Sequence, residues 1–174
     1  MTRKSKPDSW AETLWSSWRM AYIERADSIG CIFCAKPKEP DGAENMILAR
    51  GETAFVILNA FPYNPGHVMV SPYRHVGEFG ALTRDERIEI MDLLALSSDV
   101  LAETMRPQGA NVGVNLGRVA GAGIVGHIHF HMVPRWDGDT NFMPVIGQTK
   151  VIPEGLAATY AKLRTAFEAK RGVA

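Results

Sequence analysis

Polar and apolar residues alternate strictly from residue 127 to residue 132, at the start of the segment 127–134, and no other feature restricts the fold of this chain as strongly. A period of two residues is typical of a β-strand that buries one face. The buried face is predicted to carry Ile128, Phe130 and Met132. The opposite face is predicted to carry a histidine row, made of His127, His129 and His131. Neighbours in such a row lie about 6.5–7 Å apart, so the three nitrogens cannot share one metal ion unless the strand breaks.

The other elements indicate an α+β fold. Four more segments have the composition of strands, at residues 46–49, 54–58, 67–71 and 111–115, and the first two form a hairpin. A capping box of Thr83 and Glu86 begins a long helix that ends near Arg106, and a last helix begins at Pro153. The inner face of the long helix is predicted to carry Met91, Leu94, Leu101 and Met105. The inner face of the last helix is predicted to carry Leu156, Tyr160, Leu163 and Phe167. We therefore expect an antiparallel five-stranded sheet with one long central helix and helices at both ends.

The N-terminal part is predicted to be a helical arm with an aromatic face. Ser9 and Glu12 form a capping box, and the residues at helical spacing after it are Trp10, Leu14, Trp18 and Tyr22. We expect this arm to pack onto the domain or a partner subunit, with a membrane surface as the alternative. The predicted organisation is an arm at 1–30, a domain at 31–145 and a C-terminal helical extension at 146–174.

Charge and length exclude several classes of protein. The chain has 174 residues, enough for one domain with a sizeable core. Its 19 basic and 19 acidic residues give no net charge, so no overall field attracts nucleic acid or membranes. No apolar run reaches the length of a membrane span, and the basic N-terminus lacks the apolar run of a signal peptide. We expect a cytoplasmic protein.

Cys31 and Cys34 are the two cysteines of the chain. In a reducing compartment this spacing indicates metal binding or redox chemistry before a structural disulfide. A closed zinc site needs two further ligands, for which His75 and His127 are the candidates because His127 lies at one end of the histidine row. A redox dithiol or two buried thiols is the alternative.

The histidine row follows a glycine-rich loop, residues 117–126. Glycines such as Gly121 and Gly123 let backbone N–H groups approach phosphate oxygens closely, so the loop is a candidate phosphate cradle. A polar surface that happens to be rich in histidine is the alternative. His67, at the start of its own strand, is expected to be structural unless that strand lies beside the row.

Together these motifs resemble the histidine triad family. The residues that carry the resemblance lie between about 31 and 145 and are the Cys31–Cys34 pair, Asn59, Pro65-Gly66-His67, Arg74-His75, Asn115 and the histidine row. The resemblance implies an α+β domain that dimerises by joining two sheets. It also implies nucleotidyl transfer at the α-phosphate of a nucleotide.

The resemblance implies a role for each site residue. His129 would be the nucleophile that becomes adenylylated, His131 would contact the phosphate, and His67 would line the phosphate site. Asn59 would hold the ribose and Asn115 the phosphates. Family members with a Cys pair use it in a structural zinc site, here with His75 and His127, and need no organic cofactor. A neutral imidazole is a good nucleophile at pH 7, which makes the scheme chemically sound.

The flanking segments, residues 14–23 and 134–144, are similar to the branch that includes bacterial diadenosine tetraphosphate phosphorylases. In that branch inorganic phosphate, rather than water, takes AMP from the histidine, and Trp136 would lie near the substrate. One departure concerns the positions just before the triad. Many hydrolase members carry Gln and then Ser or Thr there, whereas this chain carries Gly123 and Ile124. Backbone amides of the glycine loop would then replace those side-chain contacts.

Three hypotheses follow. The first is an enzyme that cleaves dinucleoside polyphosphates or other AMP conjugates through adenylyl-His129. The second is a purine-nucleotide-binding or sensing protein with negligible catalysis. The third is a metalloenzyme that uses a His-x-His pair, although the third histidine would then have no clear role.

Overall fold

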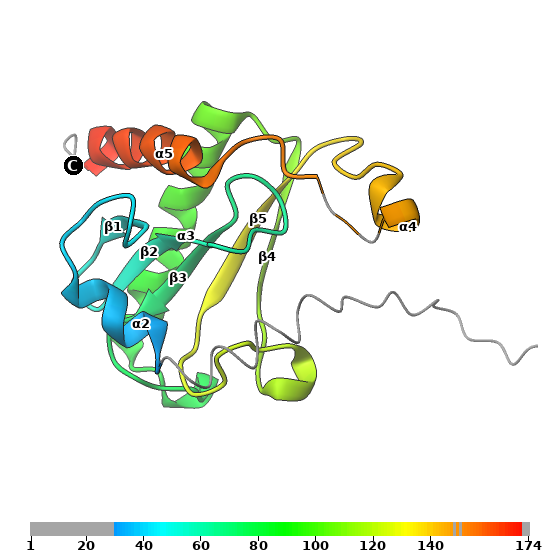
Figure 1. Ribbon diagram of the computed structural model, residues 1–174. Coiled ribbons are helices and arrows are strands. Elements are labelled where there is room, and N and C mark those ends of the chain that lie inside the picture. Colours follow the sequence, from blue (N-terminus) through cyan, green and yellow to red (C-terminus); the bar gives the residue numbers. More distant parts are fainter. Residues whose placement is uncertain (1–29, 148, 150, 172–174) are drawn as a thin grey trace, which may run out of the picture.

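The computed structural model describes residues 30–147, 149 and 151–171 (Figure 1). The predicted helix at Ser9 and the aromatic arm lie outside these residues. An antiparallel five-stranded sheet has the strand order β1-β2-β3-β5-β4. Its strands are β1 (Ile47–Arg50), β2 (Ala54–Leu58), β3 (Val68–Pro72), β4 (Gly109–Val114) and β5 (Phe130–Arg135). The predicted α+β fold with five antiparallel strands is confirmed.

Two long helices cover one face of the sheet. They are α3 (Arg84–Met105) and α5 (Leu156–Arg171), and α5 packs against both α3 and β1 (Figure 1). The short helices are α2 (Ile32–Ala35) and α4 (Met143–Gly147), with 3-10 turns η1 (Lys36–Lys38), η2 (Phe79–Ala81) and η3 (Arg118–Ala120). Within the described ranges, none of the helices is long and apolar enough to cross a membrane.

The sheet separates two hydrophobic clusters. The larger one lies under the long helices and includes Ile128 and Met132, with Phe130 packed against it. The smaller one lies on the other face and consists of Phe33, Ile47, Phe55, Ile57 and Met69. The apolar residues Ile128, Phe130 and Met132 thus lie on the core face of the sheet, as their alternation with the histidines predicts.

The histidine row differs from the prediction in three respects. Hydrogen-bonded β5 begins at Phe130, so His127 and His129 precede it. Both rings are buried, with 0% and 6% of their surface exposed, because Phe33 covers them. The ring centroids of His129 and His131 are 5.0 Å apart, closer than the spacing of a regular strand predicts. The alternative of a solvated polar surface is therefore wrong.

The long helix begins with the predicted capping box, in which Thr83 accepts from the Glu86 N–H and Glu86 accepts from the Thr83 N–H. The prediction that Met91 faces inward is wrong, since its side chain is 60% exposed. Ile90, one residue earlier, is buried, and neighbouring residues on a helix point about 100° apart. The last helix begins at Leu156 and buries Tyr160, Leu163 and Phe167 as predicted.

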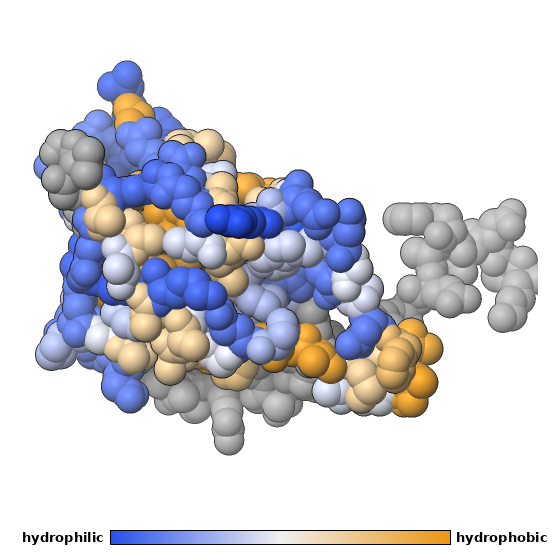
Figure 2. Space-filling view, turned by 90° about the horizontal axis from the view of Figure 1, so that it is seen from above, coloured by the Kyte–Doolittle hydropathy of each residue, from blue (hydrophilic) through white to orange (hydrophobic). Residues whose placement is uncertain are grey.

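Apolar side chains also gather at the end of the molecule that carries α4 (Figure 2). The large exposed ones in and beside this helix are Phe142, Val145 and Ile146.

Glu89 of α3 closes the turn between β1 and β2. Its two carboxylate oxygens accept the backbone N–H groups of Glu52, Thr53 and Ala54 and the Thr53 hydroxyl. A Cβ on Gly51 would lie 2.2 Å from Glu89 Oε1, so a larger residue there would push the carboxylate away from its partners in the turn. Although burial acts to raise its pKa, these hydrogen bonds hold the pKa of Glu89 below 4.5.

We predict that Glu89→Ala lowers the free energy of unfolding by about 1–3 kcal/mol, because several turn N–H groups lose their acceptor. Asp92→Ala, at an exposed position of the same helix, is the control and is expected to change stability by less than about 0.5 kcal/mol. Folding lowers the pKa of Glu89. Its contribution to the free energy of unfolding is therefore complete above pH 4.5, the ordinary pKa of the group, and disappears as the pH falls through the lower pKa of the folded state. Urea unfolding at pH 7 and pH 3 measures both effects. Equal losses in the two variants would contradict this account.

Candidate active site and metal centre

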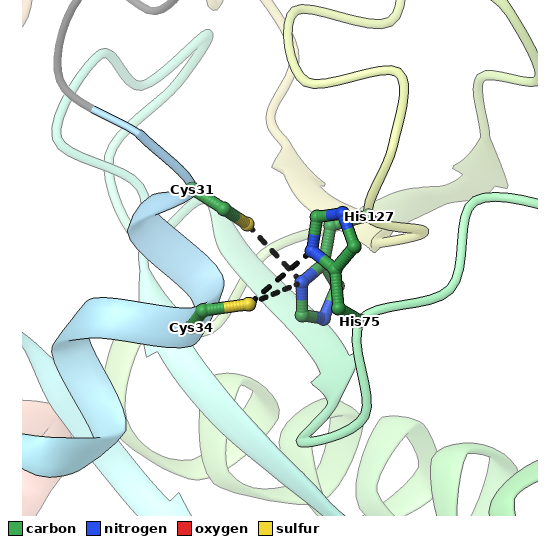
Figure 3. Close-up of side chains that lie close together, drawn as sticks. All are labelled: Cys31, Cys34, His75 and His127. Carbon is green, nitrogen blue, oxygen red and sulfur yellow. Dashed lines mark hydrogen bonds between the residues drawn. The ribbon is translucent and has the colours of Figure 1, made fainter.

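The four predicted metal ligands lie together (Figure 3). Cys31 precedes α2, Cys34 lies within it, His75 follows β3 and His127 precedes β5. Their ligand atoms all lie within 4.8 Å of one another. His127 Nδ1 is 3.2 Å from Cys31 Sγ and 3.4 Å from Cys34 Sγ, and His75 Nδ1 is 3.2 Å from Cys34 Sγ. The three segments thus converge on one point.

The donor set fits a tetrahedral metal ion. Bonds of about 2.3 Å to sulfur and 2.0 Å to nitrogen place the ligand atoms roughly 3.3–3.8 Å apart, close to the distances seen here. His127 Nε2 lies 2.8 Å from the Pro72 carbonyl oxygen and donates to it, so the Nδ1 lone pair faces the two sulfur atoms. Burial raises the pKa of the Cys31 thiol, and each of the two sulfur atoms lies within 3.4 Å of an imidazole nitrogen, a mixed donor set typical of metal sites. The cluster therefore favours metal binding over the redox alternative.

A ring contact and a hydrogen bond orient His129. Phe33 stacks on its ring with 4.6 Å between centroids, and its Nδ1 lies 2.8 Å from the His127 carbonyl oxygen. A carbonyl can only accept, so Nδ1 carries the proton and Nε2 keeps its lone pair. Burial lowers the pKa of His129, although the hydrogen bond to His127 opposes this shift. A neutral imidazole with a defined nucleophilic nitrogen results.

His67 lies behind His131. Strand β3 pairs with β5, so the condition under which His67 was expected to be functional is met. Its Nε2 is 2.9 Å from His131 Nδ1, its Nδ1 accepts the Tyr63 N–H at 3.1 Å, and none of its surface is exposed. His67, which the resemblance placed along the phosphate site, is thus fully buried beside His131.

An open cavity of about 400 Å³ lies between β4, the end of β5 and the loop before β3. Asn115 and His131 line it together with Tyr63, Asn64, Asn111, Val112, Gly113, Val114, Val133 and Arg135. Arg135 donates to both carboxylate oxygens of Asp139 and to Asn111 Oδ1, and Asn64 donates to Asp139. Polar groups and a cation thus surround a space large enough for part of a nucleotide.

Other predicted residues are placed differently. Gly123 lines a second cavity of about 240 Å³ with Cys31, His75 and Arg118, so it lies beside the metal ligands. Gly121 has a φ of 94° and ends η3. The half-buried Trp136 directly follows Arg135, and the backbone N–H of Trp136 donates to Asp139. Asn59 lies beside His67, with its Nδ2 3.3 Å from Nδ1 of that ring.

Sequence reasoning missed Phe33, Tyr63, Asn64, Arg135 and Asp139 as site residues. Arg135 and Asp139 form an ion pair four residues apart, a spacing that the sequence displays. Phe33 lies between the two cysteines, where only its contact with a distant strand reveals its role.

Comparisons with known proteins agree with this geometry. The family model described as the HIT domain matches residues 42–138. The AP-4-A phosphorylase of Mycobacterium tuberculosis strain H37Rv is 41% identical over 162 residues, which cover 88% of this chain and 83% of that protein. An uncharacterized 16.1 kDa HIT-like protein of Mycoplasma pneumoniae is 33% identical over 64% of this chain and 76% of its own.

Solved structures share the fold. A Zn-bound histidine triad family protein from Mycobacterium smegmatis matches with a TM-score of 0.66 at 22% identity, over 84% of this chain and 99% of that one. A histidine triad nucleotide-binding protein from Sulfolobus tokodaii matches with a TM-score of 0.65 at 24% identity, over 81% and 94%. The domain match and the similarity over most of the chain show that this protein belongs to the histidine triad (HIT) family.

Proposed function

We propose that the protein is a nucleotidyl-transferring enzyme that cleaves diadenosine tetraphosphate through a covalent AMP intermediate on His129, with inorganic phosphate as the acceptor. The observation that carries this proposal is the state of His129: a buried, neutral ring whose Nδ1–H is held by a backbone carbonyl. The choice of substrate and acceptor is supported by the relative named AP-4-A phosphorylase.

The reaction has two steps. Nε2 of His129 attacks the α-phosphorus, a P–N bond forms, and the P–O bond to the leaving ATP breaks. The ring then carries a positive charge, which the His127 carbonyl stabilises through Nδ1–H. An oxygen of inorganic phosphate attacks the same phosphorus, the P–N bond breaks to give ADP, and Nε2 regains its lone pair. Water in place of phosphate would give AMP.

Residues around the cavity are proposed to bind the nucleotide. Asn115 and Arg135 line it together with His131, so they are placed to contact phosphate oxygens. Trp136 is proposed to lie beside the base or ribose, and backbone N–H groups around Gly121 and Gly123 to contact outer phosphates. Asn59, which lies beside His67, is proposed to hold the ribose.

The metal is proposed to be zinc, because two cysteines and two histidines are a preferred zinc ligand set. With four protein ligands it would be structural, and it would supply a cross-link rather than Lewis-acid chemistry. The cross-link would join α2 to the residues before β5. Since α2 contains Phe33, it would also hold this ring against His129.

The remaining proposals concern organisation and location. The chain is proposed to have an N-terminal arm at 1–30, the HIT domain at 31–145 and a C-terminal extension at 146–174. A cytoplasmic homodimer with joined sheets is proposed, since β4 is an edge strand with exposed residues. Nucleic acid and membranes are not proposed as partners.

We predict that the enzyme converts diadenosine tetraphosphate into ADP and ATP only when inorganic phosphate is present. His129→Asn should lower turnover by at least about 10³-fold, because asparagine keeps an N–H for the His127 carbonyl but removes the nucleophile. Chromatography of the products, with and without phosphate, measures the phosphate dependence of the reaction and the turnover of the His129→Asn variant. AMP plus ATP without phosphate would identify a hydrolase. Tight binding without products would favour a nucleotide-binding protein.

We predict one zinc ion per chain in the purified protein. Cys34→Ser should lose most of it, because a hydroxyl is a poor zinc ligand, whereas His131→Asn should retain it. Elemental analysis of the metal content measures the difference, with circular dichroism as the check on folding. Zinc lost in His131→Asn or His129→Asn but kept in Cys34→Ser would instead identify a catalytic metal at the histidine row.

A further inference from the structure

Both contacts that orient His129 are attached to the metal-binding cluster. Phe33 stacks on His129 with 4.6 Å between ring centroids, and Phe33 lies between Cys31 and Cys34 in the sequence. The second contact is the His127 carbonyl, which accepts from His129 Nδ1 at 2.8 Å, and His127 is itself one of the four ligands. The side chains drawn in Figure 3 are therefore linked to the proposed nucleophile by one ring and one hydrogen bond.

The two cysteines are placed to form a disulfide with each other. Their Sγ atoms belong to a group of ligand atoms that all lie within 4.8 Å of one another. The Cys34 N–H donates to the Cys31 carbonyl at 3.1 Å, so the two residues occupy the ends of one turn. The Cα atoms at the ends of a turn lie less than about 7 Å apart, and a disulfide joins Cα atoms about 4.4–6.8 Å apart. Forming the bond thus requires rotation of the two side chains and little movement of the backbone.

Part of the metal-binding cluster is accessible from solvent. Both cysteines are half-buried, and His75 is exposed. The cavity of about 240 Å³ described above is lined by Cys31, His75 and Arg118, and is large enough for a molecule of the size of hydrogen peroxide. Cysteines that react with oxidants are typically partly exposed and close to a positive charge, as Cys31 is here.

We propose that the Cys31–Cys34 pair is a redox switch for His129. A peroxide oxidises the two thiolates to a disulfide, the bound metal ion is released, and both contacts that orient His129 loosen. The effect on turnover rests on the proposed function, whereas the disulfide and the release of the metal do not.

The oxidation has two steps. A thiol that coordinates a metal ion is deprotonated, and the thiolate is the form that peroxides oxidise. Cys31 Sγ attacks one peroxide oxygen, the O–O bond breaks and hydroxide leaves, which gives a sulfenic acid. Cys34 Sγ then attacks this sulfur, the S–S bond forms, the S–O bond breaks and a second hydroxide leaves. The two sulfur atoms lose two electrons, one peroxide is reduced, and two protons from solution convert the hydroxides into water.

Oxidation removes both ligands that come from the α2 region. His75 and His127 remain, and two imidazoles do not form a closed tetrahedral site. The link between α2 and the residues before β5 then depends on the packing of Phe33 against His127 and His129. Without a metal on its Nδ1, the His127 residue is held less firmly, and so is the carbonyl that accepts from His129.

Peroxide treatment of the zinc-loaded full chain at pH 7 tests the switch, with a colorimetric chelator to measure released zinc. We expect about one zinc ion per chain to be released, and the peptide with both cysteines to become two hydrogen atoms lighter. We expect kcat to fall roughly 10- to 100-fold, with a smaller change in KM. A thiol reductant plus zinc should restore both, although it does not repair oxidised methionine. Zinc that stays bound, or zinc released without a disulfide, would overturn the proposal.

Cys31→His is the matched control, because histidine is also a zinc ligand but the remaining cysteine cannot form an internal disulfide. Relative to the same variant before treatment, its zinc content and turnover should survive peroxide. Cys34→His covers the case in which Cys31→His does not fold or does not load with zinc. Loss of zinc from both variants at the peroxide dose that empties the parent protein would contradict the role of the disulfide.

Long-range ¹H–¹⁵N correlation NMR of the histidine rings tests the coupling without any nucleotide. In the reduced, zinc-loaded protein we expect His129, assigned with His129→Asn, to be protonated on Nδ1 and its signals to change after oxidation. Unchanged His129 signals in the oxidised, zinc-free protein would contradict the coupling. A chain that takes up no zinc would refute the switch together with the proposed metal site. The expected disulfide, zinc release and change at His129, in a protein without nucleotide turnover, would refute the proposed function alone.

Discussion

The pairing of β5 with β3 and β4 is the contact on which the rest of the structure depends. It places Ile128 and Met132 in the core under α3, so the histidines between them are forced onto the opposite face. A shift of one residue in this register would exchange the two faces and remove the site. In the pairing of β3 with β5, Met69 lies opposite His131. His67, which precedes β3, therefore lies beside the ring of His131.

Two backbone carbonyls give His127 and His129 different free nitrogens. The Pro72 carbonyl accepts from His127 Nε2, so that Nδ1 faces the cysteines, and the His127 carbonyl accepts from His129 Nδ1, so that Nε2 is the nucleophile. Phe33 joins the two sites, since it contacts both rings from the helix that carries Cys34. A metal ion held by this cluster would therefore support the proposed catalytic site through packing, without a direct part in the proposed chemistry.

Local sequence signals predicted the parts of the structure that depend on local physics. The alternation around Phe130 predicted both faces of its strand, and Thr83 with Glu86 predicted where α3 begins. Contacts between distant segments were not predictable: the cover that Phe33 gives to His129, the closure of a hairpin by Glu89, and the contact of His67 with His131. Each depends on the relative position of elements that only the folded sheet determines. Met91 was misassigned because an apolar residue beside a buried position looks like part of the core face.

Direct detection of the covalent intermediate tests the central claim, that His129 is a nucleophile prepared by its hydrogen bond to the His127 carbonyl. The protein would be mixed with diadenosine tetraphosphate without inorganic phosphate, quenched in alkali within one turnover, digested and analysed by mass spectrometry. The account predicts AMP on the peptide that contains His129, removed as ADP when phosphate is added and absent from His129→Asn. Turnover with AMP on another residue, or with no modified peptide at any quench time, would contradict it.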